Sequence, residues 1–480
     1  MTRAPDWDVS NLAAEVRARA VETDPMAVVV ANLERLELTD SGNASRLVAL
    51  AGDDLRYCGP LGGWLAWNGT RWVRGDDAAA RYAGDVWRTV LEEAKAAPTG
   101  KAAQRYMDHA RYSRSAKAIR ETLNVAKNDA RVVVEPSRFN ADPWLLNTPS
   151  GIVDLRTGEL APHRRDAYMT KIAAAAFDPA CATSEWEEFI RQATGGDDDF
   201  ARTLWKAAGY SLTGLTTEEV LFIVHGPGGT MKTTFAESLK SAAGVDDGYC
   251  ETADFEAFLE RRDSGGVRND LAKLAGARIV FAAEVDEGKR LAAGLLKSLT
   301  GADRMTVRFL YREAFTYRPQ FAIWLLCNHL PHASDGDDAL RRRFRVLPFT
   351  CKPERPDPAV KLRWTDPAVG GPQVLAWAIR GCLAWQREGL GTPTKIQVAT
   401  GAYWENQNPL KDFEADRLTF GPGLWVTVAS LRATYEAWGE AIGLKHLLGP
   451  RAFAERMTMH GCTKGRRKVA GETTRTWEGV

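Results

Sequence analysis

The residues best suited to chemistry lie in one glycine-rich run, Gly226-Pro227-Gly228-Gly229-Thr230-Met231-Lys232-Thr233-Thr234. This run follows an apolar, strand-like segment, Leu221–His225, and opens a helical pattern over residues 233–242. Small residues let backbone N–H groups approach phosphates, and the first turn of a helix adds its positive dipole. Lys232 would reach the terminal phosphates, and the Thr233 hydroxyl would ligate Mg²⁺. The run therefore predicts a phosphate-binding loop for ATP and Mg²⁺, in preference to a glycine-rich turn with a chance Lys-Thr pair.

One position departs from the phosphate-loop pattern. Met231 stands directly before the lysine, where the pattern has glycine. A side chain at this position strains the loop or requires a different backbone angle. We expect the substitution to affect the catalytic rate and not the fold.

Acidic residues follow a second apolar, strand-like segment at residues 277–283. A carboxylate at the carboxyl end of a neighbouring parallel strand would lie beside the Mg²⁺ site, where it could hold the metal or polarise the attacking water. Glu284 is the favoured catalytic acid because it directly ends the strand, and Asp286 is a second candidate metal ligand. The choice among Glu284, Asp286 and Glu287 stays open.

Two further polar groups flank the remaining strand-like segments. Asn328 follows residues 321–327, and its amide could position the attacking water or touch the γ-phosphate; equally, it could begin a turn. Three arginines at residues 341–343 precede a segment at 345–349. Such a run is usually a solvated face or a phosphate patch, but it is also typical of an arginine finger supplied to a neighbouring subunit.

The elements that must position these residues alternate between strand and helix, which predicts an α/β fold with a parallel sheet. Ahead of this core, Asn68-Gly69 predicts a two-residue hairpin, residues 79–97 and 101–128 predict helices, and residues 142–147 and 151–155 predict two short strands. We expect a helical lead-in at residues 1–54, an N-terminal α+β domain at 55–194, the core at 195–352, a helical segment at 353–415 and a small C-terminal domain at 416–480.

The bulk composition limits the possible partners. Sixty-three Lys and Arg against 62 Asp and Glu leave a net charge of +1, so any DNA contact must come from local basic patches. Seven cysteines without a Cys-x-x-Cys pair argue against a disulfide framework or structural zinc and fit a reducing compartment. The beginning of the chain is polar and no stretch is long enough to span a bilayer, so we expect a cytoplasmic location and no membrane partner.

The C-terminal domain has the pattern of a winged helix. Residues 428–439 predict a helix with Leu431, Tyr435 and Trp438 on one face, and residues 451–460 predict a second. A basic run then predicts a turn between two short strands that close at Trp477, with the cations Lys464, Arg466, Arg467 and Lys468. Such a wing can contact duplex phosphates, although basic turns are often only solubilising.

The order of these parts resembles superfamily 3 helicases, in particular the phage, plasmid and poxvirus primase-helicase family. The resemblance covers most of the chain after about residue 55. Its matching pieces are Gly209-Tyr210 with residues 212–214, residues 226–234, 277–288, Lys297 with 299–303 and Arg308, Phe315 with Pro319, Asn328 with Pro331, 337–344 and 348–349, together with 68–72 and 145–155 in the N-terminal region.

This resemblance implies a homo-hexameric AAA+ ring that threads single-stranded or duplex DNA and hydrolyses ATP between subunits. It implies that Asn328 is a sensor, that Arg342 or Arg343 is the finger, and that a hairpin at residues 306–317 enters the channel. Arg308, Tyr311 and Arg312 would then contact DNA, unless the hairpin is an ordinary surface one. Because no primase module fits ahead of residue 55, we expect helicase activity without primer synthesis, with a separate primase or replication protein as a partner.

Three functions compete. The first is an ATP-dependent DNA helicase for replication of a mobile element. The second is an origin-binding initiator or loader with weak ATPase, which Met231 keeps open. The third is a regulatory ATPase that senses nucleic acid.

Overall fold

The computed structural model describes residues 36–261, 268–283, 289–301, 303–308, 314–333, 338–353, 355, 357–407, 410–444, 447–469 and 471–480. The chain divides into two compact units, one of Met1–Asp154 with Glu159–Ala173 and one of Leu155–Gly158 with Ala174–Val480. Of the helical lead-in predicted at residues 1–54, the part before residue 36 lies outside the described residues. Within the described ranges, no helix is both long enough and apolar enough to cross a membrane.

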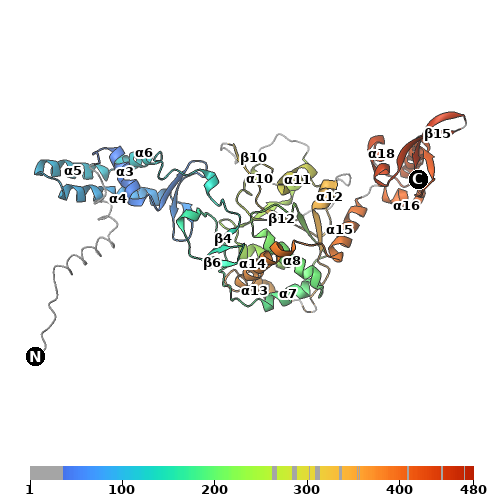
Figure 1. The fold of residues 1–480 in the computed structure, drawn as a ribbon, viewed down its shortest axis with the longest axis horizontal. Coiled ribbons are helices and arrows are strands. Elements are labelled where there is room, and N and C mark those ends of the chain that lie inside the picture. The colour runs from blue at the N-terminus through green and yellow to red at the C-terminus, as the bar shows by residue number, and fades with distance from the viewer. Residues whose placement is uncertain are drawn as a thin grey trace, which may run out of the picture. The chain divides into compact units, whose positions relative to one another are not determined.

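In its described residues, the first unit combines four helices with two small antiparallel sheets (Figure 1). The helices are α3 (Asp40–Ala51), α4 (Asp76–Lys95), α5 (Gly100–Ser113) and α6 (Ala116–Ala126). The strands are β1 (Leu55–Cys58), β2 (Gly63–Trp67) and β3 (Trp72–Arg74) in one sheet, and β4 (Leu145–Thr148), β5 (Gly151–Asp154) and β6 (Glu159–Ala161) in the other. Short 3-10 turns cover Pro136–Arg138 and Arg165–Ala167. The fully buried Arg46 of α3 pairs with Glu93 of α4 at 2.6 Å, so its charge is not left uncompensated.

The predicted two-residue hairpin at Asn68-Gly69 is wrong in length. Trp67 lies opposite Trp72, so the loop contains four residues. The Asn68 side-chain oxygen accepts hydrogen bonds from the backbone N–H groups of Thr70 at 3.0 Å and Arg71 at 2.9 Å. Because the Asn68 side chain binds the N–H groups of Thr70 and Arg71, these two residues belong to the loop and do not pair with the preceding strand.

The second unit contains a five-stranded parallel sheet, as the alternation of strands and helices predicted. The strand order is β13-β7-β12-β9-β8. The strands are β7 (Leu221–His225), β8 (Cys250–Asp254), β9 (Ile279–Ala283), β12 (Ala322–Cys327) and β13 (Phe344–Pro348). The helices are α7 (Ser184–Thr194), α8 (Asp198–Ser211), α9 (Lys232–Ala243), α10 (Asn269–Ala272), α11 (Ala293–Thr300), α12 (Asp338–Arg343), α13 (Pro358–Thr365), α14 (Gly371–Glu388) and α15 (Thr394–Asn406), with a 3-10 turn at Phe255–Phe258.

Both faces of this sheet are covered. On one face, the rings of Phe222 and Trp324 pack in a tilted arrangement with 4.4 Å between their centroids, and Phe235 of α9 packs on the same tryptophan at 5.8 Å. On the other face, the buried side chains of the strands form one cluster with those of α11 and with Tyr403 and Trp404 of α15. Helices on both faces hold the strands rigidly, so residues at the strand ends keep fixed relative positions.

The C-terminal elements follow α15. They are α16 (Lys411–Arg417), β14 (Trp425–Thr427), α17 (Val428–Ala441), α18 (Pro450–Met459), β15 (Thr463–Val469) and β16 (Glu472–Glu478). The strands form an antiparallel sheet in the order β14-β16-β15, packed on a core that includes Phe413, Tyr435, Phe453 and Trp477. The two predicted helices are present, but the basic run is not a turn. Lys464 to Lys468 lie inside β15, and their cross-strand partners extend as far as Val469 opposite Glu472.

Candidate functional site

The glycine-rich run forms a compact loop between β7 and α9. Gly226 N–H donates to the Cys327 carbonyl at 3.4 Å, and a Cβ atom on Gly226 would lie 1.9 Å from the Phe349 carbonyl oxygen. Only glycine fits there. Across the loop, the Thr230 hydroxyl donates to the Pro227 carbonyl at 2.9 Å. The loop is therefore held both by a contact within it and by the end of β12.

Lys232 is held inside this loop. Its side chain donates from Nζ to the Pro227 carbonyl at 3.0 Å, and the residue is 6% exposed. Burial, the largest cause, lowers the pKa of Lys232 below that of an ordinary lysine. A cation in this position gains more from an anion than an exposed lysine does, because less water screens the interaction.

Met231 adopts the left-handed backbone conformation, with φ 63° and ψ −3°, directly before the first residue of α9. Gly229 in the same loop also has a positive φ of 80°. Glycine reaches this region without steric cost, whereas a Cβ atom meets the following carbonyl oxygen. The departure noted in the sequence thus falls on a backbone angle that favours glycine.

Three strands bring their carboxyl ends together around the loop. In the register of the sheet, His225 is level with Cys327 on one side and with Pro348 on the other. The next residues, Gly226, Asn328 and Phe349, therefore share one edge, and Asn328 is exposed there. Burial lowers the pKa of the neighbouring His225, the charges of Lys232 and His329 lower it further, and a hydrogen bond with the Asn328 backbone opposes that lowering.

The acidic candidates Glu284 and Asp286, with Glu287, lie outside the described residues. The strand before them, β9, ends at Ala283. We had predicted that this strand would be the direct neighbour of β7, and this prediction is wrong because β12 lies between the two. Two strand spacings place the end of β9 about 10 Å from that of β7.

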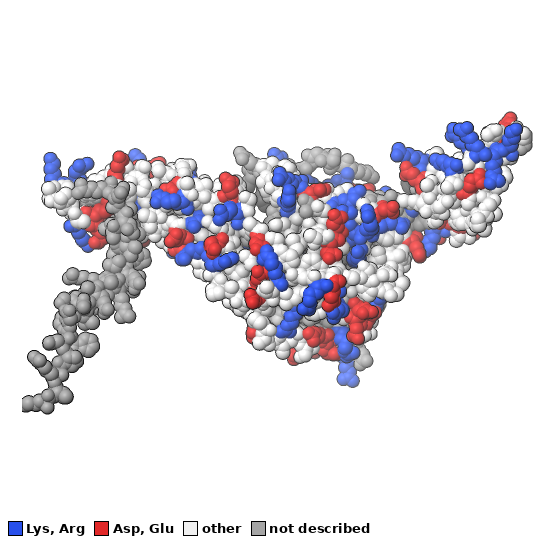
Figure 2. All heavy atoms as spheres, in the orientation of Figure 1, with Lys and Arg blue, Asp and Glu red and all other residues white. Residues whose placement is uncertain are grey.

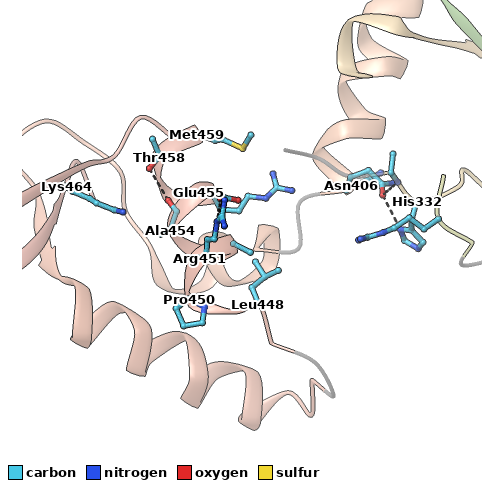
Figure 3. A pocket seen from close by; sticks show the side chains of 15 residues that line it. His332, Asn406, Leu448, Pro450, Arg451, Ala454, Glu455, Thr458, Met459 and Lys464 are labelled. Atoms are coloured by element: carbon cyan, nitrogen blue, oxygen red, sulfur yellow. Dashed lines mark hydrogen bonds and ion pairs between the residues drawn. The ribbon is translucent and has the colours of Figure 1, made fainter. Parts of the chain in front are cut away.

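The segment after Asn328 is fastened to α15. The Tyr403 hydroxyl donates to the Pro331 carbonyl at 2.8 Å. The Gln407 side-chain oxygen lies 3.1 Å from His332 Nδ1 and accepts from the Ala333 N–H at 3.2 Å. His332 lies beside the end of α15 at Asn406 (Figure 3). Three hydrogen bonds thus connect residues 331–333 with the last turn of this helix.

The arginine run lies on α12, immediately before β13, and so at the amino edge of the sheet. Arg342 is exposed. Arg343 is held within its own chain: it forms an ion pair with Glu219 and donates to Thr300 Oγ1 at 3.0 Å and to the Ala339 carbonyl at 2.9 Å. Only Arg342 of these two therefore presents an exposed side chain.

The residues expected to contact DNA lie on two hairpins. In the first, β10 (Met305–Arg308) pairs with β11 (Ala314–Tyr317), Val307 is buried and Arg308 is exposed. Tyr311 and Arg312, which we predicted near its tip, lie outside the described residues. In the second, β15–β16, the side chains of Lys464, Arg466, Arg467 and Lys468 are all exposed, but they do not point to one side.

Two family models match parts of the chain. One, described as D5 N terminal like, matches residues 44–195, and the other, described as a family of unknown function (DUF5906), matches residues 224–343. The second begins inside β7 and ends at Arg343, so it contains both the glycine-rich run and the arginine run.

Curated viral proteins are similar to parts of the chain. The helicase-named protein L207/L206 of Acanthamoeba polyphaga mimivirus is 34% identical over 142 residues, which are 29% of this chain and 14% of that protein. The helicase-named protein 022R of Frog virus 3 (isolate Goorha) is 25% identical over 266 residues, which are 51% of this chain and 27% of that protein. The chain thus spans about a quarter or less of the length of these relatives.

Among solved structures, the apo structure of the NrS-1 C-terminal region (305–718) has a TM-score of 0.40 at 13% identity and covers 67% of this chain and 88% of that one. An A form of that region has a TM-score of 0.45 at 12% identity, with 76% and 90% covered. These scores are too low to establish a shared fold. The D5-like match at the N-terminal region and the helicase-named viral relatives support the phage and poxvirus type of primase-helicase family for this chain.

Proposed function

We propose that this chain is an ATP-dependent DNA helicase or translocase, acting as a homo-hexameric AAA+ ring in the replication of a phage, plasmid or other mobile element. The observation that carries the proposal is the placement of two cations at opposite edges of one parallel sheet. Lys232 follows β7 at the carboxyl edge, and Arg342 precedes β13 at the amino edge of the adjacent strand.

This placement separates the two halves of an ATPase site. A five-residue strand is about 16 Å long, so Arg342 does not reach phosphates bound at Lys232 of its own chain. It reaches them only if the amino edge of one copy meets the carboxyl edge of the next. An interface of that kind joins two different surfaces, and it closes into a ring when the rotation between copies allows.

The loop residues fit the phosphates of ATP. At Gly228 and Gly229 the space that a Cβ atom would take is open, which permits close approach to the backbone, and Lys232 supplies a buried cation. Thr233 at the start of α9, with Glu284 and Asp286, would hold Mg²⁺, which would neutralise charge on the terminal phosphates. Asn328 would position the attacking water and Glu284 would accept its proton. Arg342 of the neighbouring copy would stabilise the charge that develops on the γ-phosphate.

The DNA contacts would come from the two hairpins. Arg308, with Tyr311 and Arg312, would meet a strand in the ring channel, where cationic and aromatic side chains suit the backbone and the bases. The C-terminal elements from β14 to β16 would form a winged helix for duplex DNA.

A second candidate is an origin-binding initiator or loader with weak ATPase. The left-handed conformation of Met231 favours it, because a strained residue beside the catalytic lysine can limit turnover without preventing nucleotide binding.

The test compares the parent chain with Lys232→Ala. We expect DNA-stimulated ATP hydrolysis, strand displacement on a forked duplex with little on a blunt one, and six-subunit particles with ATP and single-stranded DNA. All three should be lost or reduced in the variant, whose circular dichroism should be unchanged. Strict monomers under every condition would contradict the ring. ATP hydrolysis with hexamers but no strand displacement would favour the initiator.

A further inference from the structure

The hairpin β15–β16 has two faces of different charge. Because residues alternate along a strand and opposite residues share a face, Lys464, Arg466 and Lys468 lie on the same face as Arg475 and Trp477. Gly465 and Arg467 lie on the other, with Thr476 and Glu478. The basic run is therefore divided between the two sides of the sheet.

On the second face, the positive charge of Arg467 is compensated. Its guanidinium donates to both oxygens of Glu478, at 3.0 Å from Nε and 2.6 Å from Nη2, and lies 5.1 Å above the ring of Trp425. The Thr476 hydroxyl donates to the same carboxylate at 2.8 Å. Arg467 holds the pKa of Glu478 below its usual range, so this carboxylate stays ionised at neutral pH.

Gly465 makes this arrangement possible. A Cβ atom there would lie 2.5 Å from Glu478 Oε1 and 2.9 Å from Glu478 Cγ. The carboxylate side chain crosses the strand over the bare glycine to reach Arg467. Arg467 is thus a structural residue of the hairpin and is not available to a ligand.

The first face has the opposite character. Arg466 and Arg475 are direct cross-strand partners, an arrangement in which like charges repel. Lys464 lies 5.5 Å above the ring of the buried Trp477 and keeps its ammonium exposed. Lys468 continues the same row toward the tip. Lys and Arg side chains gather over this hairpin (Figure 2).

This face borders a groove. The groove has a volume of about 460 Å³ and lies between β15–β16 and the beginnings of α17 and α18. Its cationic lining is Arg432, Lys464, Arg466 and Arg475, and among the described residues no acidic side chain lines it. Arg432 is already engaged with Glu436 at 2.6 Å and with the Leu448 carbonyl at 2.6 Å. Lys464 lies alongside α18 (Figure 3).

We infer that this face, formed by Lys464, Arg466, Lys468 and Arg475, binds the phosphate backbone of duplex DNA, with Arg466 and Arg475 acting as a pair on one phosphate. An anion between the two guanidinium groups converts their repulsion into two favourable contacts. The inference rests on the proposed function for the choice of DNA as the polyanion. It adds Arg475 to the expected contacts and removes Arg467 from them.

The experiment measures binding of a fluorescent blunt duplex to the full chain, without nucleotide, over a series of salt concentrations. Arg475→Gln and Arg466→Gln should each lower the log–log salt slope by about 0.9 and weaken binding about fivefold near 0.15 M salt. Arg467→Gln is the matched control, since it removes the same charge from the same strand but from the other face. Its slope and affinity should equal those of the parent. The melting temperature of Arg475→Gln should be unchanged or higher, because the opposed charges are relieved.

Equal losses in Arg467→Gln and Arg475→Gln would show an effect of net charge and overturn the inference. So would an unchanged slope in Arg475→Gln. An RNA duplex that binds more tightly and responds equally to Arg475→Gln would assign the face to RNA. Displacement of DNA by inorganic tripolyphosphate at constant ionic strength would assign it to small anions. Repeating the series on Lys232→Ala separates the two proposals: loss of ATPase leaves this binding intact, and loss of the Arg475 effect leaves the ATPase intact.

Discussion

Met231 offers a direct test of the loop geometry, because its backbone angle carries a cost that can be measured. A residue with a Cβ atom in the left-handed region costs about 1–2 kcal/mol relative to glycine. Replacing Met231 by glycine removes this cost but also removes a half-buried side chain. Met231→Ala is therefore the matched control, since it removes nearly the same side chain and keeps the Cβ atom. The difference between the two variants isolates the strain, and we expect glycine to be favoured by about 1 kcal/mol.

Hydrogen exchange of the peptide that spans β7, the loop and α9 reports this difference locally. A gain of about 1 kcal/mol corresponds to about fivefold slower exchange in Met231→Gly than in Met231→Ala. ATP affinity and turnover of Met231→Gly should be equal to or higher than those of the parent. Equal or faster exchange in the glycine variant would refute the left-handed conformation at position 231. A large loss of ATP turnover in that variant would refute the idea that the phosphate loop favours glycine there.

Three other outcomes follow from the same site. Lys232→Ala should abolish phosphate release from ATP while leaving circular dichroism unchanged, and hydrolysis at the parental rate would rule out the phosphate-loop assignment. Lys232→Ala and Arg342→Ala should each lack ATPase activity, because an arginine finger contributes about 10³ to 10⁵ in rate. A mixture of the two variants should recover part of the ATPase activity. A mixture that co-assembles without ATPase activity would exclude Arg342 as the finger, and Arg343→Ala would be tested next. Because burial lowers the pKa of Lys232, its charge is lost at a lower pH than that of an ordinary lysine. As pH rises from the lowered pKa of Lys232 to that of an ordinary lysine, ATP affinity should fall because the cation is lost. Over the same pH range the stability of the ligand-free loop should rise, because a buried charge is removed. Lys232→Arg keeps its charge, so a pH response as steep as the parent's would assign the titration to another group.

The core strands were predictable because apolar runs identify buried parallel strands. Leu221–His225 and residues 321–327 are of this kind. The fifth strand, β8, was missed because its sequence, Cys-Glu-Thr-Ala-Asp, places polar residues on an edge strand that is only partly buried. Strand order is a long-range property without a local signal, which is why β9 was expected beside β7.

The C-terminal hairpin shows a different limit. Lys464 to Lys468 have low strand preference and include a glycine, so the local pattern favoured a turn. The antiparallel ladder with β16 overrides that preference. The missed residue Arg475 had a usable signal: it is two positions from the predicted core residue Trp477, and so on the same face of an alternating strand. Which of Arg342 and Arg343 is engaged by Glu219 depends on packing and had no comparable signal.

The attachment of residues 331–333 to α15 has a mechanical consequence. Asn328 cannot move far toward a bound nucleotide unless Pro331 and His332 move with it or release Tyr403 and Gln407. The last turn of α15 therefore braces the segment that follows Asn328. A displacement of this helix end would change the position of Asn328 at the carboxyl edge of the sheet.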